Sequence, residues 1–328
     1  MIEMNAILLF TCACLAADAA PRQTVVVVVG AEGTPEYGKQ FREWAGRWKA
    51  AAERGNAEYI PIGLDDAGDA ADRDLLKQRL TQQAGVAASE PLWLVLIGHG
   101  TFDGKSARFN LRGPDVAPAE IAEWLKESER PVAVVNCASC SSPFLAELSG
   151  PGRVVVTATK SGFEHNFARF GDSLSSALLD PRADLDKDDQ VSLLEAYLMA
   201  SAGVREFYEK EGRLATEHSL LDDNGDRMGT PADWFQGVRA VKTGKDGAAL
   251  DGLRAAQLCL VRSRQEQDLP PVTRARRDQL EQELAQVRKR KTELPEDEYL
   301  TLLEPLLVEL SRLYEEPPAT DSKPARTR

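Results

Sequence analysis

The sequence predicts an α/β fold: a doubly wound, mostly parallel sheet flanked by helices, followed by an all-helical C-terminal extension. Short runs that are apolar throughout alternate with segments of helical periodicity, which is typical of central parallel strands covered by helices on both faces. From about Gly247 onward no further strand is indicated, and polar helices with leucine stripes follow. These two observations define a sheet domain and a helical part.

The first half of the chain supplies the strands and helices of the sheet. Thr24 to Val29 is a β-branched run and forms the first predicted strand. Thr34 and Pro35 then fit the N-cap and the first position of a helix. Right-handed crossovers place the carboxyl ends of parallel strands at one edge of the sheet. Further strands are predicted at 59–62, 92–97, 132–136 and 153–159, and further helices at 72–83 and 118–127.

The second half of the chain is predicted to be mainly helical. We divide the whole chain into a signal peptide at 1–19, a sheet domain at 21–240, a helical extension at 247–316 and a tail at 317–328. The tail is predicted to be disordered because it is polar and rich in proline. Helices are predicted at 173–179, 193–209, 252–267, 274–293 and from Pro295 onward past Pro305. Within the polar segment 218–231, the run Asp222 to Asp226 is interpreted as a turn.

The N-terminal residues and the overall charge limit the classes of protein to which the chain can belong. The apolar run Ala6 to Ala16, followed by Ala17-Asp18-Ala19, resembles a secretory leader with its cleavage site and is too short to span a membrane. A secreted or periplasmic protein without a transmembrane span is therefore expected. The net charge of −12 and the absence of a large basic cluster argue against a nucleic-acid partner. The three cysteines beyond the leader form no disulfide framework.

A histidine and a cysteine follow two of the predicted central strands. His99 comes after the run 92–97, and Cys137 comes directly after the run 132–136. Because the carboxyl ends of parallel strands share one edge, where ligands gather, the two side chains are expected to meet there. Two other interpretations stay open: a buried cysteine of purely structural role, and a redox motif formed by Cys137 and Cys140.

This pair has the composition of a nucleophilic site. A neighbouring imidazole and the N-terminus of a following helix both lower the pKa of a thiol, which makes the thiolate available for attack. Acyl transfer also needs hydrogen-bond donors for the oxyanion. The main-chain N–H groups of Gly100, which lacks a Cβ, and of Cys137 are the candidates.

The residues around this pair resemble the clan of cysteine peptidases that contains caspases, legumains and gingipains, with legumains closest. The motifs are Ile97-Gly98-His99-Gly100 and Asn136-Cys137-Ala138-Ser139, and the resemblance covers about 24–179. It implies a caspase-like fold for the domain at 21–240, with His99 as general base, Cys137 as nucleophile and Gly100 as oxyanion donor. The chain departs from the legumain pattern at Cys140, where a glycine is usual, and at Glu32, where an asparagine would orient the histidine.

In the resembling clan, the loop after the next strand lines the pocket for the residue before the scissile bond. The matching loop here is 160–169. Glu164 in that pocket would favour a basic substrate residue, whereas Lys160 or Arg169 would favour an acidic one. Both preferences stay open.

An acidic loop before the helix at 193–209 has the spacing of an EF-hand-type calcium site. An apolar residue stands at the eighth position, and Asp189 stands where glycine is usual, as a residue that tolerates the left-handed conformation. The alternative is a solvated acidic helix cap. The candidate calcium ligands are Asp184, Asp186, Asp188, Gln190 and Glu195.

Two functions follow from these patterns. The first is an exported cysteine endopeptidase (a hydrolase) resembling legumains, which needs no cofactor for catalysis, holds calcium as a structural ion and acts on protein or peptide substrates. The second is a catalytically inactive caspase-like module that binds calcium and a protein partner. The helical extension is interpreted as an inhibitory segment or as an arm for partner binding or self-association.

Overall fold

The computed structural model describes residues 22–64, 71–86, 89–242 and 250–315. A seven-stranded sheet with the order β2-β1-β3-β6-β7-β8-β9 forms its centre. The first five of these strands pair in parallel, and the last two add antiparallel pairs at one edge. The strands are β1 (Thr24–Val29), β2 (Glu58–Ile62), β3 (Leu92–Ile97), β6 (Val132–Asn136), β7 (Arg153–Thr157), β8 (Leu220–Asp222) and β9 (Thr230–Pro231).

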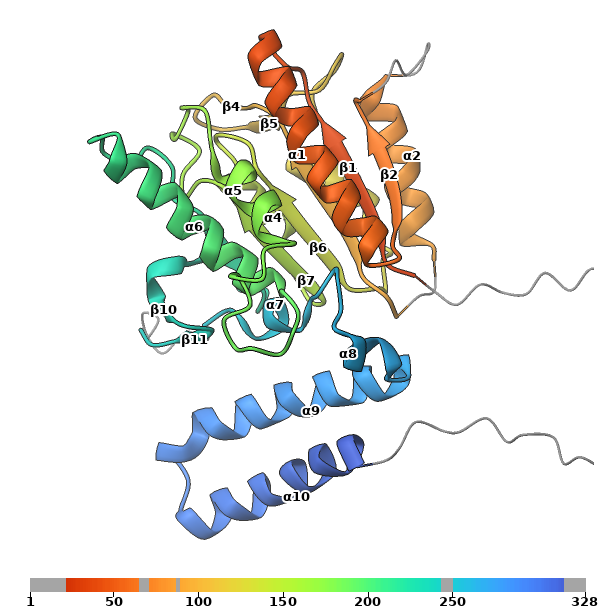
Figure 1. Cartoon of the computed structure of the whole chain (residues 1–328), viewed down its shortest axis with the longest axis vertical. Helices are drawn as coiled ribbons and strands as arrows, with labels where there is room; N and C mark the ends of the chain where they lie inside the picture. Colours follow the sequence, from red (N-terminus) through yellow and green to blue (C-terminus); the bar gives the residue numbers. More distant parts are fainter. Residues whose placement is uncertain (1–21, 65–70, 87–88, 243–249, 316–328) are drawn as a thin grey trace, which may run out of the picture.

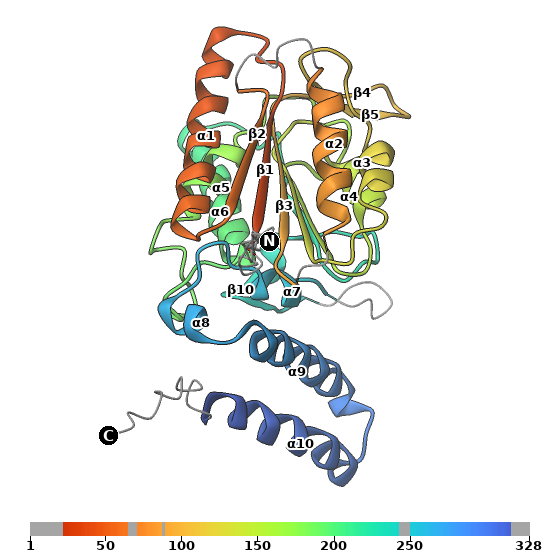
Figure 2. The ribbon, with the colours of Figure 1, turned by 90° about the vertical axis from the view of Figure 1, so that its right-hand side faces the viewer.

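Helices cover both faces of the sheet, so the predicted doubly wound, mostly parallel fold class is confirmed (Figure 2). Successive strand residues point to opposite faces, and Val25 and Val27 accordingly join one apolar core while Val26 and Val28 join the other. One helical layer consists of α1 (Pro35–Arg54), α5 (Phe170–Ala177) and α6 (Leu193–Lys210); the other consists of α2 (Asp72–Ala84), α3 (Pro118–Trp124) and α4 (Ser142–Leu148).

Two antiparallel strands, which were not predicted, lie within the polar segment 218–231, on either side of a bend at 224–227 that agrees with the predicted turn. Leu221 of β8 pairs with Val156 of β7, and Thr230 of β9 pairs with Leu221 in turn. Strands of two or three residues are too short to show a period of two, and tertiary pairing fixes them. Two small hairpins accompany the sheet: β4 (Gly100–Phe102) with β5 (Ala107–Phe109), and β10 (Phe235–Gln236) with β11 (Arg239–Ala240), the latter preceded by the 3₁₀ turn η1 (Ala232–Trp234).

The predicted single helix at 252–267 is also wrong, because the chain leaves the helical conformation in its middle. The Gln23 side chain donates to the carbonyls of Cys259, at 3.1 Å, and Leu260, at 3.2 Å. These carbonyls bind the body of the protein instead of closing a helix. The C-terminal elements are α7 (Leu253–Gln257), α8 (Arg264–Asp268), α9 (Pro271–Lys289), η3 (Arg290–Thr292) and α10 (Glu296–Glu315), which includes Pro305 as expected.

Helices α9 and α10 form a hairpin that lies beyond the amino ends of the strands (Figure 1). Glu90, just before β3, accepts hydrogen bonds from Arg262 at 2.6 Å and Arg274 at 2.8 Å. Figures 1 and 2 place β4 and β5, which follow His99, at the opposite end of the molecule. No helix of the described residues combines the length and hydropathy needed to cross a bilayer. The predicted signal peptide at 1–19 and tail at 317–328 lie outside the described residues.

Candidate active site

His99 lies at the carboxyl edge of the sheet, in an aromatic surrounding. Its ring meets Tyr37 edge to face at 4.9 Å between centroids and Phe41 at 5.2 Å, and Phe167 packs against it at 6.0 Å. The first two side chains come from α1, which covers this face of the sheet. The ring is therefore held in position by packing from one side, while His99 remains partly exposed.

The main chain of Glu32, and not its side chain, contacts the histidine. Nε2 of His99 lies 3.3 Å from the Glu32 carbonyl oxygen, whereas the Glu32 carboxylate pairs with Arg42 at 3.3 Å. A carbonyl only accepts, so this contact places the ring proton on Nε2 and leaves Nδ1 as the basic nitrogen. The main-chain carbonyl of Glu32 can therefore select the tautomer of His99.

Cys137 lies inside the protein, and no hydrogen bond joins its sulfur to His99 among the described residues. Its N–H donates to Leu96 O at 2.9 Å, so the strand pairing continues one residue beyond β6. Ala133, Val135 and Cys137 thus alternate onto the same core face. The side chain is 1% exposed. Burial, with a smaller contribution from Glu217, raises the pKa of the Cys137 thiol to about 12.

Gly100 contacts the turn that follows Cys137 rather than Cys137 itself. Its N–H lies 3.5 Å from Ser139 Oγ, and this hydroxyl donates to the Gly100 carbonyl at 3.3 Å. A Cβ at Gly100 would lie 2.2 Å from the Ser139 carbonyl oxygen and 3.4 Å from the Ala138 Cβ. The two strand-end turns are therefore packed main chain against main chain, and glycine is required there.

The structure brings together a different cysteine and histidine, a pair that was not predicted from the sequence. Cys140 Sγ lies 3.1 Å from His165 Nδ1. The Cys140 N–H donates to the Glu164 carbonyl at 3.0 Å, which ties the turn to the loop 160–169. Cys140 has a φ of 55°, a left-handed conformation that is unfavourable for cysteine. Its side chain is 1% exposed, and burial is the largest influence raising the pKa of its thiol.

Cys140 could have been singled out from the sequence, because the resemblance implies a glycine at its position. Its positive φ is a conformation that glycine adopts readily. The partner is harder to find, because His165 is 25 residues away and its approach depends on the fold of a loop.

The three residues of the loop 160–169 that were predicted to set specificity lie in different environments. Lys160 is exposed. The Glu164 carboxylate accepts from His218 Nδ1 at 2.6 Å and from the Lys160 N–H at 3.0 Å. Arg169 lies over the Phe207 ring with its guanidinium 4.0 Å from the centroid. Glu164 and Arg169 are thus engaged within the protein, and Lys160 is the exposed charge of the three.

The acidic loop has part of the geometry predicted for calcium. Carboxylate oxygens of Asp184, Asp186 and Asp188 lie within 4.8 Å of one another. Asp189 has a φ of 66°, which is the left-handed conformation expected at the glycine position. Burial and the neighbouring carboxylates raise the pKa of Asp186 to about 6. This concentration of negative charge would favour a cation.

The other two predicted calcium ligands lie differently. One Glu195 oxygen accepts from the Leu185 N–H at 2.7 Å, and the other accepts from the Ser192 N–H and hydroxyl, both at 2.8 Å. Glu195 thus closes the capping box at the start of α6. Gln190 donates to Asp188 at 2.7 Å. The structure therefore gathers the three aspartates and gives Glu195 a capping role.

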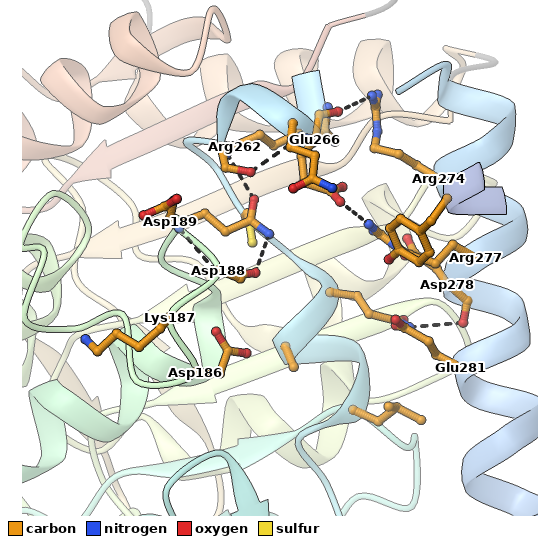
Figure 3. A pocket seen from close by; sticks show the side chains of 18 residues that line it. Asp186, Lys187, Asp188, Asp189, Arg262, Glu266, Arg274, Arg277, Asp278 and Glu281 are labelled. Carbon is orange, nitrogen blue, oxygen red and sulfur yellow. Dashed lines mark hydrogen bonds and ion pairs between the residues drawn. The ribbon is translucent and has the colours of Figure 1, made fainter. Parts of the chain in front are cut away.

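The acidic loop opens onto a polar cavity of about 390 Å³ between the sheet domain and α9. Figure 3 shows Asp186 and Asp188 on one side of the cavity, with Arg277, Asp278 and Glu281 of α9 on the opposite side. Arg277 pairs with Asp278 at 2.7 Å and also with Glu266. Burial raises the pKa of both Asp278 and Glu281. Helix α9, whose residues line this cavity, lies at the opposite end of the molecule from β4, which follows His99 (Figure 1).

Comparison with known proteins shows similarity in structure only. No family model matches the chain, and none of the curated proteins matches it. The Drosophila initiator caspase Dronc matches with a TM-score of 0.40 and 13% identity, over 62% of this chain and 80% of Dronc. Caspase-1 from Spodoptera frugiperda matches with a TM-score of 0.39 and 9% identity, over 62% and 86%. Raptor from Chaetomium thermophilum matches with a TM-score of 0.33 and 11% identity, and this chain covers 18% of Raptor. Solved caspases are thus among the structures to which this α/β protein is similar.

Proposed function

We propose that the chain is a thiol-dependent peptide hydrolase in which Cys140 is the nucleophile and His165 its base. The contact of 3.1 Å between Cys140 Sγ and His165 Nδ1 carries this proposal. It is a cysteine–histidine pair within direct proton-transfer reach, which is the arrangement required of an activated thiol. It lies in the turn that follows β6, at the carboxyl edge where α/β proteins bind ligands.

The backbone at Cys140 supports the same assignment. Left-handed conformations of ordinary residues cost about 1–3 kcal/mol and cluster at active sites. Cys140 adopts one, with a φ of 55°, between the end of β6 and the start of α4. A strained strand-to-helix turn is also how α/β hydrolases present their nucleophile. The hydrogen bond from the Cys140 N–H to Glu164 holds this turn in place.

The chemistry is an ordinary two-step acyl transfer. His165 takes the thiol proton, and the Cys140 sulfur attacks the scissile carbonyl carbon. The C–N bond then breaks, the leaving amine receives the proton from His165, and the acyl group stays on sulfur as a thioester. Water, deprotonated by His165, hydrolyses that thioester and restores the thiol. The Gly100 N–H is the proposed oxyanion donor, because its present contact with Ser139 Oγ, at 3.5 Å, is long and easily exchanged.

The pair His99 and Cys137 remains the assignment implied by the resemblance to legumains. It would require the Cys137 side chain to leave the core, where burial raises the pKa of its thiol to about 12. The Cys140 assignment requires a smaller movement, in which the loop 160–169 uncovers a thiol that is already beside a histidine. Either assignment makes the protein a cysteine peptidase acting on peptide substrates. Export through the signal peptide at 1–19 stays a prediction.

Labelling with peptide acyloxymethyl ketones carrying Asn, Asp, Arg or Lys tests the proposal. We expect mass spectrometry to find one adduct, on Cys140, which is lost in His165→Ala and retained in Cys137→Ala. The matched variant His99→Ala separates the two histidines. An adduct on Cys137 that is lost in His99→Ala would instead establish the pair implied by the legumain resemblance and contradict ours.

A non-catalytic binding module is the second candidate function, and one observation favours it. Cys137 and Cys140 are both 1% exposed, and burial raises the pKa of each thiol. Neither is therefore a ready thiolate in this conformation. This candidate predicts that none of the four peptide ketones reacts, although a small general thiol reagent still labels the folded protein slowly.

We also propose that calcium binds the acidic loop as a structural ion. Placing a divalent cation among Asp184, Asp186 and Asp188 would relieve their mutual repulsion, so calcium should raise the melting temperature. We expect a rise of several degrees in millimolar calcium, lost in Asp186→Asn. The exposed carboxylate of Asp226, outside the loop, provides the control variant Asp226→Asn. An equal response of the wild type and Asp186→Asn would contradict the proposal.

A further inference from the structure

The hairpin of α9 and α10 carries an exposed apolar stripe on α10. Of the twelve large hydrophobic side chains that are exposed in the described part of the chain, five belong to this helix. Leu300 and Leu307 are 49% and 40% exposed. They stand seven residues apart, so they form one line along the helix, which we name the α10 stripe. Tyr314 continues this line but interacts with Arg277 of α9 and lines the polar cavity.

The α10 stripe lies beside the face that packs on α9. Half-buried apolar residues of α10 recur at alternating spacings of three and four, the repeat of a helix–helix seam. They are Tyr299, Leu303, Leu306, Leu310 and Leu313. At about 100° per residue, this seam and the α10 stripe together cover an arc of roughly 140°. Within the described residues, α9 packs on the seam, while Leu300 and Leu307 beside it remain exposed.

The charges of the two helices indicate what would cover the stripe. Helix α10 contains six acidic residues and one basic residue, Arg312. Helix α9 contains five basic and three acidic residues, and Arg276 already pairs with Glu309 of α10 at 2.7 Å. A leucine stripe on an acidic helix is complementary to a basic helix with its own apolar face.

A second copy of the hairpin fits this surface less well. Two α10 stripes facing each other would bring two strongly acidic helices together. Helix α9 has a suitable charge, but its one large exposed hydrophobic side chain is Val272, in its first turn. Neither helix of a second copy thus combines a basic surface with an apolar stripe.

The position of the hairpin decides between the two roles left open by the sequence. Arg262 and Arg274 attach its base to Glu90, at the amino ends of the strands. Cys140 and His99 follow the carboxyl ends of those strands. In this arrangement the hairpin does not cover the candidate active site, so it is not placed as an inhibitory segment. We infer that the α10 stripe is a docking surface for a basic amphipathic helix of a protein partner.

Binding of a synthetic helix to the full-length chain tests this inference. The probe is a leucine–lysine peptide of about three heptads, and the control peptide keeps its lysines but has serine in place of leucine. We expect the leucine peptide to bind the wild type at least about tenfold more tightly than Leu300→Gln/Leu307→Gln, because two leucine contacts are lost. The control Leu214→Gln/Val241→Gln changes exposed residues elsewhere and should bind as the wild type does.

Two results would overturn the inference. Equal binding of the leucine peptide to the wild type and to Leu300→Gln/Leu307→Gln, or equal binding of both peptides to the wild type, would mean that only the overall negative charge attracts it. A wild-type dimer that dissociates in Leu300→Gln/Leu307→Gln, observed by sedimentation, would make a second copy the occupant. Circular dichroism checks that the helices of each variant are intact, so a loss of binding is not a loss of folding.

Discussion

Replacing Gly100 with alanine is expected to destabilise the protein and to abolish the reactivity of Cys140. The new Cβ would lie 2.2 Å from the Ser139 carbonyl oxygen, which is main chain and cannot rotate away. Overpacking of this kind costs about 1–3 kcal/mol. The two turns at the carboxyl edge must also separate, and a displacement of about 1 Å can cost two orders of magnitude in rate. Thermal unfolding and the rate of Cys140 modification measure the two effects.

Gly46 provides the control for this experiment. It lies on the exposed side of α1, where a Cβ would meet nothing within 4 Å. Alanine is favoured over glycine in helices by about 1 kcal/mol, so Gly46→Ala should stabilise the protein slightly and leave Cys140 labelling unchanged. If Gly100→Ala melted at the wild-type temperature and reacted at the wild-type rate, the close packing of the two turns would be refuted.

The unfolding free energy is expected to fall as the pH rises from about 4 to about 7, because of a buried aspartate. Burial is the largest of the influences that raise the pKa of Asp251 to about 7, from an ordinary value near 4. The folded state therefore binds a proton that the unfolded state releases, and the resulting stabilisation is complete below pH 4 and lost toward pH 7. Three pKa units correspond to about 4 kcal/mol as an upper value.

Asp251→Asn is the variant that isolates this effect. The amide oxygen can still accept from the N–H groups of Asp223 and Asn224, which now donate to Asp251 at 2.9 and 3.2 Å, and the amide nitrogen can donate to Thr230. Denaturant unfolding between pH 4 and 8 should give a much flatter curve for Asp251→Asn than for the wild type. A variant with the same slope as the wild type would place the pH dependence elsewhere.

The same pair of aspartates gives a local signal of the titration. Asp223 accepts from the N–H groups of Gly252, at 3.0 Å, and Ala255, at 2.9 Å, at the start of α7. Burial raises the pKa of Asp223 as well. When both carboxylates are charged, they repel each other. Hydrogen exchange at the Gly252 and Ala255 amides should therefore accelerate above neutral pH by more than the intrinsic pH dependence of amide exchange.

The fold could be predicted from the sequence because the central strands are apolar on both faces. The predicted strands at 24–29, 92–97 and 132–136 agree with β1, β3 and β6, since continuous apolar runs bounded by turn residues leave few alternatives. The elements that escaped prediction are those fixed by distant partners. Strands β8 and β9 are too short to show a pattern, and the break after α7 depends on the Gln23 side chain, 236 residues away from Cys259.

The sheet edge that carries the candidate site could be located from the sequence, but the contact between Cys140 and His165 could not be predicted. His99 and Cys137 follow the strand ends as expected. The strand pairing continues through Cys137, however, and a single residue of extension turns its side chain into the core. The neighbour of Cys140 is decided by the loop 160–169, whose conformation depends on the hydrogen bond between Cys140 and Glu164. The hydrophobic periodicity of the sequence does not predict the conformation of such a loop.

The distance between the hairpin and the carboxyl edge of the sheet sets a minimum linker length for any substrate that docks on the hairpin. The strands between them are five or six residues long, which corresponds to about 20 Å. A partner docked on α10 would need a linker of at least about six extended residues to present a segment to Cys140. Within such a linker range the local concentration of that segment would reach the millimolar level. Linker length would then contribute to the selection among docked proteins.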